Sequence, residues 1–198
     1  GAVAVSSLFD LATTTAGYVF LLADEKGLAR VNWREQRFVG SPFWKGYVAG
    51  IQPNGGSLSA SGPLAWVLGG SNESEQQTVM FGVTTPGGYS QPLLPKEATP
   101  VGGGTYITVH PGGRAIAWLG TDIVVGFTNR PFGARQPTLG RYDGSGATKY
   151  SKTIASSGET HSIIDFRGGL IGSFIEGGEV NVQRMDPLLD KVGVPMTF

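Results

Sequence analysis

The chain has 198 residues, with no cysteine, 15 basic and 15 acidic side chains, and 40% hydrophobic residues. This composition excludes disulfides, thiolate metal ligands and cysteine nucleophiles, provides no basic surplus for nucleic acid, and is too apolar for wholesale disorder. The 32 glycines and 12 prolines, with only 15% charged residues, favour many short strands joined by tight turns. Apolar runs such as 18–23 are far shorter than the ~20 residues of a membrane helix, so we expect no membrane insertion.

In chain order, the sequence repeats one pattern four times: a short apolar segment, a glycine-bearing turn and a second apolar segment. The paired segments are 3–8 with 17–22, 47–51 with 62–68, 106–110 with 113–119, and 161–166 with 169–175. Gly17, Gly62, Gly113 and Gly169 open the second segments at intervals of 45, 51 and 56 residues. These intervals are close to the roughly 40–50 residues of a propeller blade.

The later part of each repeat is predicted to form a further hairpin. The hairpins of the second, third and fourth repeats are 78–83 with 89–94, 139–143 with 148–154, and 179–185 with 192–198. Residues 39–43 (VGSPF) match residues 192–196 (VGVPM) without a gap, 153 positions later. Each repeat is therefore predicted to contain about four strands.

These patterns predict an all-β, β-propeller-like single domain. Its four blades, each of about four antiparallel strands, span about residues 2–45, 46–99, 104–156 and 159–198. The blades are expected to form either a closed four-bladed ring or part of a larger propeller. A β-sandwich is the alternative, because it also places short strands at regular intervals.

The fourth repeat carries a recognisable motif at residues 182–186 (VQRMD), followed by 192–195 (VGVP) and preceded by 169–174 (GLIGSF). This arrangement resembles repeats in bacterial extracellular proteins, which run apolar strand, Gly-Gly, apolar strand ending in an aromatic, Gln-Arg-Phe-Asp, then Val-Gly. The match is good in the fourth repeat, partial in the first and third, and faint in the second. The resemblance implies a propeller at a secreted or cell-surface location, with a cytoplasmic location as the alternative. It implies a structural role for the motif residues and carries over no catalytic residue.

No sequence motif points to a catalytic centre. No serine lies in a Gly-x-Ser-x-Gly turn, and residues 102–104 (GGG) precede a strand pattern rather than the lysine and helix of a phosphate loop. Of the two histidines, His110 is predicted in a turn, while His161 begins the innermost strand of the fourth repeat and could face a central channel. Carboxylates after the second strands could serve a glycosidase: Asp24, Glu25, Glu73, Glu75, Asp122 and Glu176. We assign no catalytic residue, metal ligand or cofactor.

The candidate binding residues lie where the repeat pattern is interrupted. The other two tryptophans lie in predicted second strands, where they are expected to pack between blades. Trp33 and Trp44 fall outside these strands. An exposed tryptophan can bind a sugar ring or a protein partner. In the third repeat, the extra residues 128–137 have the composition of a recognition loop. The candidate binding residues are Trp33, Trp44, Arg130, Phe132, Arg135 and His161.

The sequence therefore predicts a non-catalytic recognition or scaffold module that binds a protein or glycan through loops on one propeller face. One alternative is a carbohydrate-active hydrolase with carboxylates at the channel mouth. Another is a structural subunit of a larger homo- or hetero-oligomeric assembly.

Overall fold

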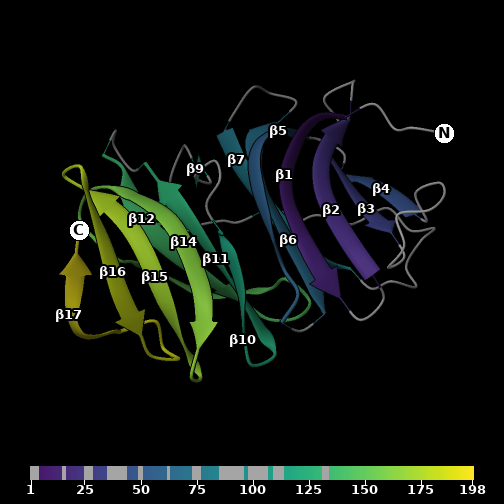
Figure 1. Cartoon of the computed structure of the whole chain (residues 1–198). Coiled ribbons are helices and arrows are strands. Elements are labelled where there is room, and N and C mark those ends of the chain that lie inside the picture. The colour runs from purple at the N-terminus through teal and green to yellow at the C-terminus, as the bar shows by residue number, and fades with distance from the viewer. Residues whose placement is uncertain are drawn as a thin grey trace.

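The structure is a computed structural model that describes residues 5–14, 17–24, 29–34, 44–48, 51–61, 63–72, 77–84, 96–97, 107–108, 114–130 and 134–198. These residues form four antiparallel sheets, and the main strands of each sheet are hydrogen-bonded in chain order (Figure 1). The all-β, antiparallel prediction is confirmed. Within the described ranges, no helix has the length and apolar character needed to cross a membrane.

Each sheet is a meander in which short connections join antiparallel neighbours. The first sheet contains β1 (Val5–Thr14), β2 (Gly17–Asp24), β3 (Ala29–Arg34) and β4 (Trp44–Val48). The second contains β5 (Ile51–Ser59), β6 (Leu64–Asn72), β7 (Gln77–Thr84) and β8 (Lys96–Glu97). The third contains β10 (Ile116–Leu119), β11 (Asp122–Asn129), β12 (Gln136–Tyr142) and β13 (Thr148–Thr153), and β9 (Ile107–Thr108) also pairs with β11. The fourth contains β14 (Glu159–Phe166), β15 (Gly169–Glu176), β16 (Glu179–Met185) and β17 (Lys191–Thr197).

The predicted first strand of the second repeat, residues 47–51, is wrong. Val48 ends β4, the last strand of the first sheet, and Ile51 begins β5, the first strand of the second. The apolar residues on both sides of this junction resembled one strand, although they belong to two sheets. The matched segment 39–43 lies outside the described residues.

The first two strands of the third repeat were predicted one strand out of step, whereas its hairpin, predicted at 139–143 with 148–154, is present as β12 and β13. Its innermost strand is β10, which was predicted as the second strand, and the true second strand is β11. Every residue of β11 is buried, and after its first residue, Asp122, the strand is continuously apolar or neutral, so it lacks the alternation that marks a half-exposed strand. The connection between β11 and β12 is consequently only residues 130–135, shorter than the predicted insertion at 128–137.

The four sheets lie side by side in chain order. The innermost strands make the successive contacts, β1 with β5, β5 with β10, and β10 with β14. Figure 1 shows the first sheet (purple) and the last sheet (yellow-green) at opposite ends of the molecule. The described strands therefore form no closed four-bladed ring, and their four separate sheets also differ from the two facing sheets of a sandwich.

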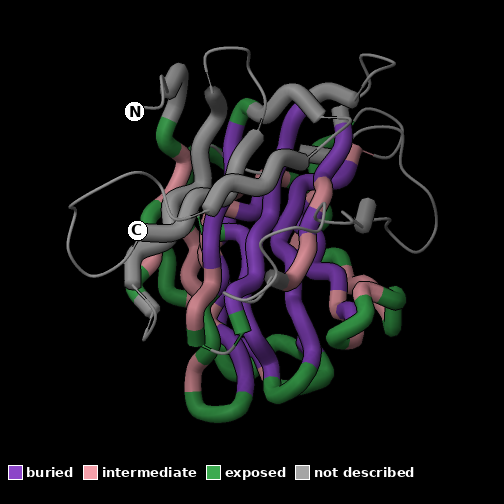
Figure 2. Tube along the Cα trace, turned by 90° about the vertical axis from the view of Figure 1, so that its right-hand side faces the viewer, coloured by how far each residue is buried: buried purple, intermediate pink, exposed green. Residues whose placement is uncertain are grey.

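Two apolar layers join the last three sheets, and Figure 2 shows the buried residues running along the strands, with exposed residues at many of the turns. Between the second and third sheets, the layer includes Val67, Phe81, Val125, Phe127 and Tyr142. Between the third and fourth sheets, it includes Val124, Leu139, Leu170, Phe174 and Met185. Burying each large apolar side chain contributes roughly 1.5–3 kcal/mol, so these layers fix the sheets relative to one another.

Aspartates at equivalent places, Asp143 after β12 and Asp186 after β16, hold the outer hairpin turns. One carboxylate oxygen accepts the N–H groups two and four residues later, at 2.8 and 3.0 Å for Asp143 and at 2.8 and 2.9 Å for Asp186. Gln183 is fully buried, and its Nε2 donates to the carbonyls of Arg184 (2.8 Å) and Val192 (3.0 Å). In the fourth repeat, these motif residues stabilise the hairpin.

Candidate functional site

A hollow lies where the innermost strands of the second, third and fourth sheets come together. Its polar lining comes from Ser59 and Ser61 at the end of β5, Arg114 before β10, and Asp165 near the end of β14. Apolar residues of β10 and β14, Ile163 among them, form the rest of the wall. The hollow has a cavity volume of about 80 Å³, so it is shallower than the roughly 300–1,000 Å³ of ligand sites that enclose a whole small molecule.

The backbone of Arg114 is fixed against β14, while the residue itself is exposed. Its N–H donates to Ser162 Oγ (2.9 Å), and its carbonyl accepts from the N–H of Ile163 (2.6 Å). Asp165 is also exposed, and neither Arg114 nor Asp165 forms an ion pair with a residue that the structure describes. The hollow therefore presents one cation and one anion to solvent.

His161 lies at a register shift in the pairing of β14 with β15. Thr160 pairs with Phe174, and Ser162 pairs with the adjacent Ser173, so His161 is the extra residue of a β-bulge. Its Nδ1 lies 3.3 Å from Ser173 Oγ and 3.2 Å from Ser162 Oγ. The structure thus places His161 on the innermost strand, as predicted, in a half-buried hydroxyl cluster.

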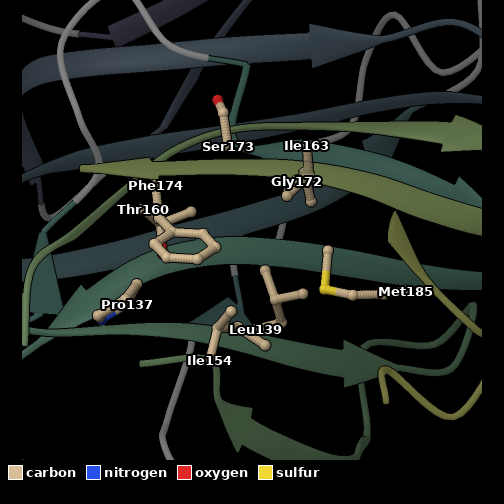
Figure 3. Close-up of a pocket in the computed structure, with 9 residues that line it drawn as sticks. All are labelled: Pro137, Leu139, Ile154, Thr160, Ile163, Gly172, Ser173, Phe174 and Met185. Carbon is tan, nitrogen blue, oxygen red and sulfur yellow. The ribbon is translucent and has the colours of Figure 1, made fainter. Parts of the chain in front are cut away.

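A second cavity between the third and fourth sheets is apolar (Figure 3). Its cavity volume is only about 10 Å³, and it is lined by residues such as Leu139, Phe174 and Met185. Figure 3 shows Ser173 directed away from the other lining side chains, and the hydroxyl of Thr160 already donates to the carbonyl of Phe127 (2.9 Å). This cavity is a space between packed sheets with little polar chemistry.

The three candidates of the loop between β11 and β12 are not brought together into one described patch. Arg130 is half-buried, and its Nε has no hydrogen-bond partner in the described part of the chain. Phe132 lies outside the described residues. Arg135 is exposed and forms an ion pair with Glu159 at the start of β14, so it links the third sheet to the fourth.

The strand register brings together two residues that the sequence grouped. Trp33 of β3 and Trp44 of β4 are directly paired in the outermost hairpin of the first sheet. The positions of their side chains lie outside the described part of the structure. The two tryptophans are thus neighbours in the sheet.

Asp122, one of the candidate carboxylates, is already paired. It begins β11, its side chain is only 4% exposed, and its Oδ2 lies 2.7 Å from both Arg141 Nε and Lys149 Nζ. Burial raises the pKa of Asp122, but the hydrogen bonds from Lys149 and Arg141 outweigh this effect and hold the pKa below its ordinary value. Arg141 also donates through Nη1 to the Pro187 carbonyl of the fourth sheet, so this charge cluster joins two sheets.

Glu176 lies at the end of β15 and accepts a hydrogen bond from Ser157 Oγ (3.1 Å). The side chains of the other candidate carboxylates, Asp24, Glu25, Glu73 and Glu75, lie outside the described part of the structure. Within that part, no group of three or more histidine, aspartate or glutamate residues is arranged to hold a metal ion.

Sequence reasoning missed the residues that line the hollow. Arg114 was assigned to a second strand, because the third repeat was predicted one strand out of step. Ser59, Ser61 and Asp165 lie near the ends of innermost strands, where polar residues are common in any turn. One signal could have found them. Aligning the first strands of the four repeats would have placed their ends at equivalent positions, and such ends approach one another when sheets are arranged radially.

No protein-family model and no curated protein sequence matches the chain. Among solved structures, the chain is similar to the glutaminyl cyclase of Myxococcus xanthus, with a TM-score of 0.44 and 11% sequence identity. The similarity covers 91% of this chain and 66% of that chain. Similarity of this degree assigns neither a fold family nor a function.

Proposed function

We propose that the four sheets are blades of a β-propeller-like arc and that the chain is a non-catalytic recognition module. Four successive meanders, joined through their innermost strands, support the propeller-like arrangement. In such an array, the ends of the innermost strands form a shared surface to which several blades contribute. The hollow between β5, β10 and β14 lies at such a place.

The lining of the hollow supports a glycan ligand. The observation that carries the proposal is the presence of exposed Arg114 and Asp165 beside the hydroxyls of Ser59 and Ser61, over an apolar wall. Sugar hydroxyls both donate and accept hydrogen bonds, so a carboxylate and a guanidinium can bind adjacent hydroxyls. A glycan ligand also suits the secreted or surface location that the repeats imply.

The hydrolase alternative requires a second carboxylate. Glycosidases act with two carboxyl groups roughly 5–10 Å apart. Asp165 is the one acidic residue among the described residues that line the hollow. The chemistry on this surface therefore favours binding over hydrolysis.

The test is a glycan array followed by titration calorimetry with the best glycan. We expect wild type to bind and Arg114→Ala and Asp165→Asn each to weaken binding by about tenfold, since each removes a charge-assisted hydrogen bond. Arg167→Gln is the matched control, because Arg167 is exposed in the neighbouring turn but does not line the hollow. Unchanged affinity in both hollow variants would contradict this site, and a wild-type protein that binds no glycan would leave protein binding as the form of recognition to test.

The other predicted binding residues form a separate proposal for a contact surface. Trp33 and Trp44 are paired in the outermost hairpin, far along the sheet from the innermost strand β1. A Trp44→Ala variant in the same titration separates the two surfaces. Lost binding in Trp44→Ala with intact binding in Arg114→Ala would assign the ligand to the hairpin.

A further inference from the structure

The first and last sheets each expose apolar side chains on a face that no other described sheet covers. On the last sheet, the large apolar side chains with at least 39% of their surface exposed include Ile164, Val180, Val192, Met196 and Phe198. On β1 of the first sheet, Leu8 is 58% exposed and Leu11 is 44% exposed. Monomeric proteins rarely leave a whole sheet face of this kind without a function.

The uncovered face of the last sheet is equivalent to a face that is covered inside the molecule. Counted back from the turn between the first two strands, the pair Ile164 and Ile171 of the fourth sheet occupies the place of Ala117 and Val124 of the third. Ala117 and Val124 are buried against the fourth sheet. Ile164 and Ile171 therefore lie where a fifth sheet would pack.

The uncovered face of the first sheet is equivalent to the other side of that interface, which is the face of the fourth sheet that packs against the third. Both β1 and β14 contain a register shift, after Leu8 and after Thr160. Counted from this shift, Leu8 corresponds to Thr160 and Leu11 to Ile163. Thr160 and Ile163 are buried against the third sheet, whereas Leu8 and Leu11 are exposed.

We propose that a second copy of this chain docks on both faces, with the last sheet of each copy against the first sheet of the other. The two uncovered faces are unlike each other, and each is equivalent in register to one side of the internal interface between the third and fourth sheets. Such a head-to-tail contact closes into a ring when the rotation permits. Two copies supply eight sheets, within the 4–8 blades of known propellers, whereas three copies would exceed that number.

The size of the faces also favours two contacts at once. Four strands about 4.8 Å apart, each about seven residues long, cover roughly 400 Å² in projection. A standard stable interface buries roughly 800 Å² on each partner. One face is therefore small for a stable dimer, but a closed ring covers both faces of each copy and reaches the required area.

The experiment measures mass in solution by sedimentation over a wide range of protein concentration. We expect a dimer for wild type, and Ile164→Glu or Leu11→Glu to raise the dissociation constant by at least about tenfold, because each buries a charge in the apolar contact. Leu188→Glu is the matched control, since Leu188 is 59% exposed in the turn after β16. Melting temperatures near that of wild type would show that the variants fold, as expected for exposed positions.

Mixing the two variants tests the head-to-tail arrangement. A mixed dimer of Ile164→Glu and Leu11→Glu has one contact with both faces intact, whereas a dimer of either variant alone has none. Mixing should therefore give a lower dissociation constant than either variant alone, although a higher one than wild type. A monomeric wild type, an open polymer, or dimerisation that is insensitive to Leu11→Glu would overturn the proposal. Sedimentation is measured without glycan. Ile164 also borders the hollow, whereas Leu11 does not, so the effect of Leu11→Glu distinguishes docking from glycan binding.

Discussion

Replacing Thr160 by valine should weaken the contact between the third and fourth sheets while leaving the strand pairing within each sheet intact. The Thr160 hydroxyl accepts from the N–H of Thr138 (3.2 Å) and donates to the carbonyl of Phe127 (2.9 Å). Both partners belong to the third sheet, and Thr160 is only 4% exposed. Valine has nearly the same shape as threonine but neither donates nor accepts, so both backbone groups lose this partner.

The expected loss of stability follows from the two groups left unsatisfied. A buried donor or acceptor without its partner costs about 1–3 kcal/mol. The methyl group that replaces the hydroxyl recovers roughly 0.8 kcal/mol of apolar transfer. We therefore expect Thr160→Val to lower the free energy of unfolding by about 1–5 kcal/mol.

Urea unfolding followed by tryptophan fluorescence and by circular dichroism measures this loss. With a urea slope of about 2–3 kcal/mol/M, the midpoint should fall by about 1 M. The control is Thr153→Val, because Thr153 lies opposite Thr138 in β13 but is exposed, and it should stay within about 0.5 kcal/mol of wild type. If the two variants lose equal stability, the inter-sheet hydrogen bonds contribute nothing specific and the reasoning is refuted.

Three further predictions concern burial, charge and backbone conformation. Leu170→Ala, at a fully buried position between the third and fourth sheets, should lower the free energy of unfolding by about 2–5 kcal/mol in the same assay, and a loss below about 1 kcal/mol would show that the sheets are not packed there. Because the folded pKa of Asp122 lies below its ordinary value of 3.8, its carboxylate stabilises the fold above that pH, and this contribution is lost as the pH falls through the folded pKa. Asp122→Asn should therefore be less stable than wild type near about pH 6, with a gap that narrows near about pH 3; a constant gap would contradict the ion-pair account. Gly158→Ala should be more destabilising than Gly177→Ala in thermal unfolding, because both glycines have positive φ (108° and 63°) but only at Gly158 would a Cβ meet a backbone oxygen, and equal melting temperatures would argue against that contact.

The sequence was sufficient to predict strands, turns and their number per repeat. Local signals carry that information: apolar segments of strand length, glycine-bearing turns, and aspartates such as Asp143 and Asp186 that bond to their own turns. The prediction failed where a local signal was ambiguous. In β11, burial on both faces removes alternation, and the junction at Val48 and Ile51 joins two strands of different sheets.

The candidate site was less accessible from sequence. The hollow depends on residues separated by about 50 positions, such as Ser59, Arg114 and Asp165, and each lies near a strand end with no motif around it. The prediction that Arg130, Phe132 and Arg135 form one recognition loop rested on an insertion that shortened once β11 was placed. Trp33 and Trp44 were singled out as individual exceptions, and the strand register made them a pair.

The sequence alone determined that this protein is built from repeated antiparallel meanders, because alternation, apolar runs and turn residues are properties of short segments. Tertiary structure decided how the meanders are arranged. Whether four sheets close or remain an arc depends on the angle between neighbouring sheets, which arises from side chains packed across inter-sheet layers such as that around Leu139 and Leu170. The same packing decides which faces stay uncovered, and it brings the ends of three innermost strands together around the hollow.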